Sequence, residues 1–154
     1  MDDKTKEIAI RPSSIKEACS YIEHGSQTFA VAMGGFIDDF QANWKNPEKQ
    51  YSMISDEPSS FSDKDNILNR KVAAIAAQLA TDFNLPKPKW TVASHWTIGE
   101  EYFDLFANAS YDTKQLVKEN ALPEFAKRKI FEGDAVMLRD GVRKTAAWYR
   151  EKNK

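Results

Sequence analysis

The fold is decided by residues 68–83, LNRKVAAIAAQLATDF. Large apolar side chains recur there every three or four residues, as on one face of an α-helix: Leu68, Val72, Ile75, Leu79 and Phe83. Alanines at positions 73, 74, 76, 77 and 80 occupy much of the remaining circumference. Small side chains on several sides let neighbouring helices approach closely, so this stretch is predicted to be a central helix packed by several others.

Two helices are predicted before the central one. The first starts at Ser14 with the spacing of a capping box and stops before Gly25, because glycine tolerates the left-handed conformation common at helix ends. The second covers residues 26–44. Its apolar stripe consists of Phe29, Met33, Phe36, Phe40 and Trp44. Gly34-Gly35 interrupts that stripe at a cost of about 1 kcal/mol per glycine, which is typical of a kink or of close approach by another helix.

Prolines and helix-start signals divide the rest of the chain. Residues 45–61 are predicted to be irregular, and residues 90–96 are predicted to form a short strand or an irregular crossing after two prolines that hold the backbone extended. Four further helical stretches are predicted, starting at Thr97, Asp112, Pro123 and Asp134.

These segments predict an all-α fold, a single compact bundle of six to eight helices with at most a minor β element. The helical domain is predicted to cover residues 13–150, between a loose N-terminal segment at 1–12 and a frayed C-terminus at 151–154. A chain of 154 residues with 42% hydrophobic content is long enough to bury a core of this kind.

Composition limits the kinds of site the chain can hold and the compartment in which it is expected. The single cysteine, Cys19, excludes an intramolecular disulfide and a multi-cysteine zinc site. The longest apolar run, Val72 to Ala77, is too short to span a bilayer. A soluble cytoplasmic protein that does not bind membranes is therefore expected.

Charge is unevenly distributed along the chain. Residues 1–66 carry 12 acidic and 7 basic groups, whereas residues 67–154 carry 11 acidic and 15 basic groups. The net charge is only −1, which is weaker than the strongly basic balance of a dedicated nucleic-acid binder. The distribution nevertheless allows a basic surface toward the C-terminus.

No recognised catalytic constellation accompanies these features. His24 and His95 lie far apart in the sequence, and neither has a partner at metal-ligand spacing. Asp38 and Asp39 diverge by about 100° on a helix, so their carboxylates do not converge on one site. No cofactor, no metal and no enzymatic activity are expected; a small helical hydrolase with scattered carboxylates is the least favoured alternative.

Two segments of the second half place aromatic or aliphatic residues beside basic ones. They are LPKPKW at residues 85–90 and LPEFAKRKIF at residues 122–131. In the second, Lys127, Arg128 and Lys129 fan around a short helix, so one cation can turn inward toward a helix C-terminus or a buried acid, a role that suits arginine better than lysine. Three interpretations stay open: a solvated charge run in which Arg128 makes a structural pair, contact with a partner protein, and phosphate contact.

The two segments resemble phrases of an uncharacterised bacterial family. Its members show a Gly/Asn-Leu-Pro-x-Pro-x-Trp phrase after a helix, then an aromatic pair, then a phrase like Ser-Pro-x-x-Phe-Arg-Arg-Arg-x-Ile-Phe. The corresponding parts here are residues 84–90, Tyr102-Phe103 and residues 122–131, and the likeness covers about residues 14–138. Many members carry an amino-terminal helix-turn-helix domain of the phage-repressor type and look like regulators or antitoxin partners. Only residues 1–12 precede the first predicted helix, so direct operator reading is not expected.

The resemblance implies a non-enzymatic protein-binding module, an antitoxin-like or regulatory partner in a bacterial two-gene system. Such a module would cover the active region of a toxin-like protein with aromatic anchors rimmed by charge. The candidate partner-binding residues are Trp90, Trp96, Lys127, Arg128 and Lys129; for the tryptophans, core packing is the competing interpretation. The alternative function is nucleic-acid binding through the basic C-terminal third, and a homodimer stays open.

Overall fold

The computed structural model describes residues 11–103, 107–131, 137–139 and 142–153. Its α-helices are α2 (Ile15–Glu23), α3 (Phe29–Ala42), α4 (Pro47–Ser55), α5 (Ile67–Asp82), α6 (Tyr111–Asn120), α7 (Pro123–Lys127) and α8 (Ala146–Lys152). Short 3₁₀ helices are η1 (Lys64–Asn66), η2 (Lys89–Val92) and η3 (Ser94–Trp96). The strands β1 (Leu138–Arg139) and β2 (Val142–Arg143) pair antiparallel over two residues each. The predicted all-α fold is confirmed.

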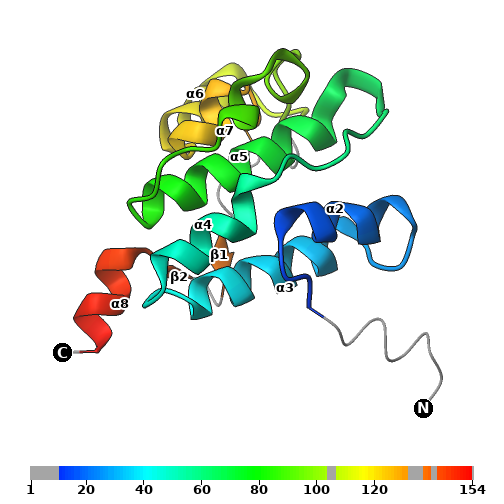
Figure 1. Ribbon diagram of the computed structural model, residues 1–154. Helices are drawn as coiled ribbons and strands as arrows, with labels where there is room; N and C mark the ends of the chain where they lie inside the picture. Colours follow the sequence, from blue (N-terminus) through cyan, green and yellow to red (C-terminus); the bar gives the residue numbers. More distant parts are fainter. Residues whose placement is uncertain (1–10, 104–106, 132–136, 140–141, 154) are drawn as a thin grey trace.

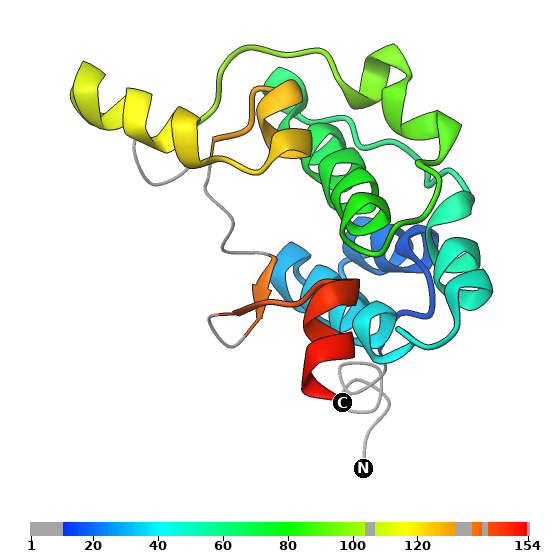
Figure 2. The ribbon, with the colours of Figure 1, turned by 90° about the vertical axis from the view of Figure 1, so that its left-hand side faces the viewer.

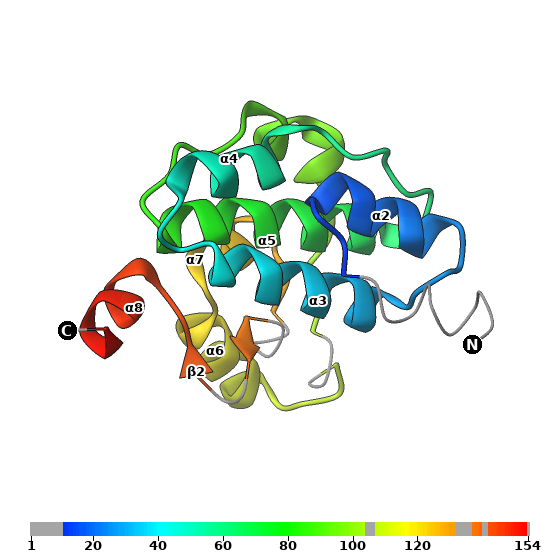
Figure 3. The same ribbon diagram turned by 60° about the horizontal axis from the view of Figure 1, so that its bottom comes forward.

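Helix α5 lies at the centre of the molecule (Figures 1 and 3). Its buried residues are distributed around the whole helix and include Val72, Ala73, Ala74, Ile75, Ala76, Ala77, Leu79 and Ala80. Polar side chains of the same helix, Asn69, Arg70 and Gln78, are also buried. Because buried polar groups need hydrogen-bond partners, α5 organises both the apolar core and the polar contacts of its neighbours.

Helices α2 and α3 cover one side of α5 (Figure 3). The predicted start of α2 is confirmed, because the Ser14 hydroxyl accepts a hydrogen bond from the backbone N–H of Glu17 at 3.0 Å. Gly25 follows the end of this helix with a φ of +75°, the left-handed conformation predicted for it. The middle of the predicted apolar stripe on α3 is fully buried, at Met33, Phe36 and Phe40.

Helix α4 corrects the prediction that residues 45–61 are irregular. Asn46 caps this helix by accepting the backbone N–H of Lys49 at 3.1 Å, and Pro47 occupies the first turn. Proline is favoured at that position because its missing N–H has no intrahelical partner there. The buried Gln50 side chain then donates to the carbonyl of Phe40 at 3.1 Å and ties α4 to α3.

The helix predicted from Thr97 is not formed over its described residues. Tyr102 instead forms a parallel bridge with Ile130, donating its N–H to the Lys129 carbonyl at 2.9 Å and accepting the Phe131 N–H at 2.7 Å. The local capping pattern is overridden by this long-range pairing. Residues 104–106 lie outside the described residues.

The C-terminal region is only partly helical, which corrects the helix predicted from Asp134. Its described part consists of β1, β2 and α8, while residues 132–136 and 140–141 lie outside the described residues. Tyr149 of α8 stacks on Trp44 with ring centroids 5.3 Å apart, so α8 packs near the end of α3. Helix α8 runs to Lys152, beyond the predicted boundary at residue 150, and most of the predicted loose segment 1–12 is also outside the described residues.

Candidate functional site

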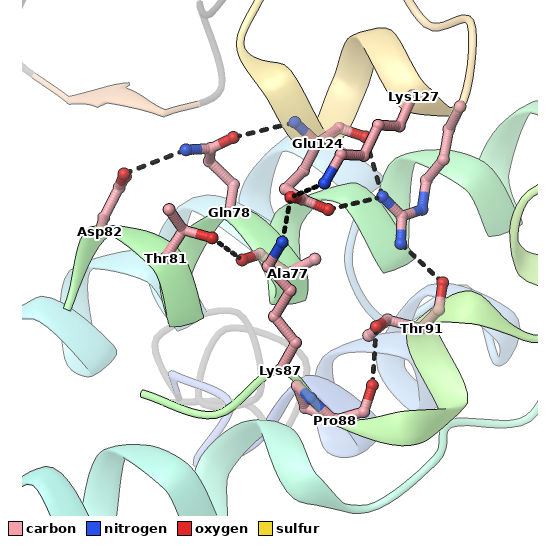
Figure 4. Close-up of polar contacts among 10 residues, drawn as sticks. Ala77, Gln78, Thr81, Asp82, Lys87, Pro88, Thr91, Glu124 and Lys127 are labelled. Carbon is pink, nitrogen blue, oxygen red and sulfur yellow. Dashed lines mark hydrogen bonds and ion pairs between the residues drawn. The ribbon is translucent and has the colours of Figure 1, made fainter. Parts of the chain in front are cut away.

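A buried carboxylate with three cations joins the two segments that the sequence singles out (Figure 4). Glu124, in the first turn of α7, is buried, and its Oε2 accepts hydrogen bonds from Lys87 Nζ at 2.6 Å and Lys127 Nζ at 2.9 Å. Its Oε1 accepts from Arg128 at 3.2 Å. We call these four side chains the Glu124 cluster. It connects the loop after α5 with α7.

The electrostatics of the cluster keep Glu124 ionised. Burial alone raises the pKa of a carboxyl group, but hydrogen bonds from Lys87, Lys127 and Arg128 outweigh it and lower the pKa of Glu124 from 4.5 to about 2. The same contacts raise the pKa of Lys127, chiefly through its hydrogen bond to Glu124. All three cations therefore face a permanent negative charge at neutral pH.

Arg128 is the inward-facing cation of the basic run, with a side chain only 2% exposed. Besides its contact with the Glu124 carboxylate, it donates to the Glu124 carbonyl at 2.9 Å and to the Thr91 carbonyl at 2.6 Å. Its hydrogen bond to Thr91 holds the segment that contains Trp90 and Trp96 against α7. The structural pair that the sequence allowed for Arg128 is thus present.

Helix α5 contacts the Glu124 cluster through the side-chain amide of Gln78. The Oε1 of Gln78 accepts the backbone N–H of Glu124 at 3.2 Å, which satisfies a donor at the start of α7. The Nε2 of Gln78 donates to Asp82 at 3.0 Å. These contacts position α7 on the central helix (Figure 4).

A second buried arginine, Arg70 of α5, is bound by backbone carbonyls. It donates to Asn66, Asp65, Glu100 and Arg128 at 2.6 to 2.9 Å. Burial lowers its pKa, while nearby acids act in the opposite direction. Gly99 lies directly against this guanidinium, since a Cβ there would be 2.3 Å from Arg70 Cζ. Arg70 thereby fixes three chain segments that meet at the end of α7.

The two candidate tryptophans are core residues. Trp96 is fully buried and Trp90 is nearly so, with ring centroids 4.9 Å apart. The indole N–H of Trp90 donates to the Ile54 carbonyl at 2.9 Å, and that of Trp96 donates to Glu57 at 3.0 Å. The core-packing interpretation is therefore confirmed for both tryptophans, which pack the interior and satisfy their polar atoms there.

The five predicted partner-binding residues are thus divided between interior and surface. Arg128 lies inside with the tryptophans, and its hydrogen bond to Thr91 connects it to their segment. Lys127 and Lys129 are exposed. Lys129 adopts a φ of 58°, a left-handed backbone conformation directly after the short helix. Only these two lysines are placed where a partner can reach them.

Helix α6 is the surface feature that the sequence analysis did not single out. It extends away from the rest of the molecule (Figure 2), and none of its residues is buried. Tyr111 and Leu116 are 75% and 59% exposed. Its lysines lie over neighbouring aromatic rings, Lys114 over Phe103 and Lys118 over Phe131, 5.1 and 5.7 Å from the ring centroids. Residues 111–120 have only weak apolar periodicity, so little in the sequence indicated that this helix exposes Tyr111 and Leu116.

The histidines occupy separate surface positions. His24 lines a polar hollow of about 300 Å³ together with Lys16, Ser20, Glu23 and Ser59. His95 lies 3.2 Å from Glu57, which also accepts the Trp96 indole N–H. Within the described ranges, no group of three or more His, Cys, Asp or Glu side chains is arranged to hold a metal ion.

Comparisons with known proteins give no relative: no family model, no curated protein and no solved structure matches the chain. In the part of the chain that the structure describes, no helix combines the length and apolar character needed to cross a membrane.

Proposed function

We propose that the protein is a non-enzymatic protein-binding module, resembling an antitoxin or regulatory partner in a bacterial two-gene system. Its partner-binding surface is α6 together with the exposed lysines at the end of α7. Tyrosine is among the residue types enriched at the hot spots of protein interfaces, and α6 exposes Tyr111 on the same helix as Leu116. The partner is covered by this surface, and the buried tryptophans keep the underlying scaffold rigid.

The observation that carries this proposal is the absence of any buried residue in α6, a helix of ten residues. Isolated helices of this length are marginal in water, and most helices in proteins are stabilised by packing an amphipathic face. The described contacts of α6 are local and peripheral: the Ser110 cap, the ion pair between Lys118 and Glu101, and lysines resting on aromatic rings. A partner that covers Tyr111 and Leu116 supplies the missing packing.

The test compares matched acidic substitutions on two helices. The tagged protein is used to isolate its partner from the native host, and the purified partner is titrated calorimetrically against wild type, Leu116→Asp and Val31→Asp. Val31 is 49% exposed on α3 and serves as the control. We expect Leu116→Asp to weaken binding by about 2 kcal/mol, or roughly 30-fold, and Val31→Asp to have little effect. Failure of wild type to capture any protein, or equal affinities for all three, would contradict the proposal.

The alternative, nucleic-acid binding through the C-terminal third, is supported by the exposed cations Lys127, Lys129, Arg150 and Lys152. It predicts binding that falls steeply from about 50 to 300 mM salt, because neutralised phosphates release counterions. An electrophoretic shift series with duplex DNA and with RNA distinguishes the two functions. The absence of a shift even at low salt eliminates the alternative.

A further inference from the structure

We infer that Lys87 and Lys127 together form a receptor for a carboxylate side chain of the partner. The inference rests on the proposed function, because it specifies the chemistry of the protein that α6 and α7 bind. Its basis is the Glu124 cluster, in which both ammonium nitrogens lie within hydrogen-bond distance of the same oxygen, Glu124 Oε2. Two nitrogens held around one atom are close enough for a single incoming anionic group to bridge them.

The charge count of the cluster leaves positive charge at the surface. Glu124 contributes one negative charge, and the buried Arg128 balances it through the other carboxylate oxygen. The charges of Lys87 and Lys127 therefore exceed what Glu124 can neutralise. Both side chains reach solvent, with exposed fractions of 40% and 61%. The surplus charge is consequently presented to an approaching molecule.

The two lysines are also held in place before a ligand arrives. A free lysine side chain loses up to about 2 kcal/mol of rotamer entropy when it is fixed. Glu124 offsets part of this cost in advance, because it already positions both ammonium groups, and each ammonium has three N–H donors of which Glu124 takes one in the described contacts. Preorganisation of this kind favours binding of an anionic group.

A protein carboxylate fits this receptor better than a nucleic-acid backbone does. Duplex and single-stranded nucleic acids require cations that track successive phosphates, whereas the receptor consists of two ammonium groups around one point. The whole chain has a net charge of −1, unlike the strongly basic balance of nucleic-acid-binding proteins. α7 begins at Pro123, immediately after the turn that follows α6, so the receptor adjoins the proposed partner surface along the chain.

The experiment uses an acetylated and amidated tetraglutamate peptide as the probe. Backbone amide shifts of the ¹⁵N-labelled full chain are followed by NMR while the peptide, inorganic phosphate or a short DNA duplex is added. Three proteins are compared: wild type, the double variant Lys87→Gln/Lys127→Gln, and the control Lys16→Gln/Lys49→Gln, which removes two exposed lysines from α2 and α4. The control has the same net charge as the double variant.

We expect the peptide to shift the amides of residues 87 and 127 in wild type and in the control. In Lys87→Gln/Lys127→Gln the affinity should fall about tenfold, as for the loss of two exposed ion pairs. Equal affinity in all three proteins, no shift in wild type, or tighter binding of phosphate or DNA than of peptide would overturn the inference. The peptide assay does not involve Leu116, so the receptor and the α6 surface can fail separately.

Discussion

Replacing Glu124 with glutamine keeps the shape of the side chain and removes its charge. Arg128 then remains buried beside a neutral amide, and removing one partner of a buried ion pair costs about 3 to 5 kcal/mol. Two features reduce this value: Arg128 keeps its hydrogen bonds to the carbonyls of Glu124 and Thr91, and Lys87 and Lys127 are partly screened by solvent. We therefore expect Glu124→Gln to lower the free energy of unfolding by about 2 to 3 kcal/mol at pH 7.

The lowered pKa of Glu124 makes this stabilisation depend on pH. A decrease from 4.5 to about 2, at about 1.4 kcal/mol per pKa unit, corresponds to about 3 to 4 kcal/mol. Since the pKa is lower in the folded state, this stabilisation is fully present above about pH 5 and is lost as the pH falls from 4.5 toward 2. The difference between wild type and Glu124→Gln should therefore shrink over that interval.

Urea unfolding monitored by tryptophan fluorescence measures both effects. The control is Glu101→Gln, the same chemical change in the ion pair with Lys118, whose side chains are 47% and 31% exposed. Such a pair contributes at most about 1 kcal/mol. If Glu124→Gln unfolds at the same urea concentration as Glu101→Gln, or if its deficit persists unchanged to pH 2, the assigned role of the buried carboxylate is refuted.

Three further predictions concern Gly99, Cys19 and Trp96. Gly99→Ala should destabilise the protein by about 2 kcal/mol in urea unfolding, because the new Cβ would meet the Arg70 guanidinium. The control Gly35→Ala, whose Cβ makes only ordinary contacts, should be neutral or stabilising. Equal urea midpoints for the two variants would contradict this prediction. Burial raises the pKa of Cys19 to about 12, so Ellman's reagent should label it only in urea, and rapid native labelling would show an accessible thiol. Trp96→Ala should cost about 3 to 5 kcal/mol in thermal unfolding, and an unchanged midpoint would exclude its core role.

The helices that the sequence predicted correctly are those with strong local signals. The capping spacing at Ser14 and the glycine at position 25 mark both ends of α2, and the apolar stripe of α3 is buried as expected. Helix α4 was missed: residues 45–61 were predicted to be irregular, although Pro47 stands at a helix start, where proline is favoured. The helix predicted from Thr97 failed because pairing of Tyr102 with Ile130 depends on a segment far away in the sequence.

For the candidate site, residue type predicted an inward-facing arginine in the basic run, and the buried pair of Arg128 with Glu124 agrees with it. The tryptophans could not be assigned from sequence, because an aromatic side chain beside lysines serves equally as a core residue or as an interface anchor. Their burial and indole hydrogen bonds place them in the core. Exposure of α6 was equally undetectable, since it depends on what does not pack against the helix.

The all-α class and the central place of α5 could be predicted locally, because apolar periodicity and capping act between residues three or four positions apart. The tertiary structure was needed to show which distant backbone groups the buried arginines bind. Arg128 reaches Thr91 across 37 positions, and Arg70 reaches the Arg128 carbonyl across 58. The solvation and charge of each group depend on these distant contacts, and no local pattern encodes them.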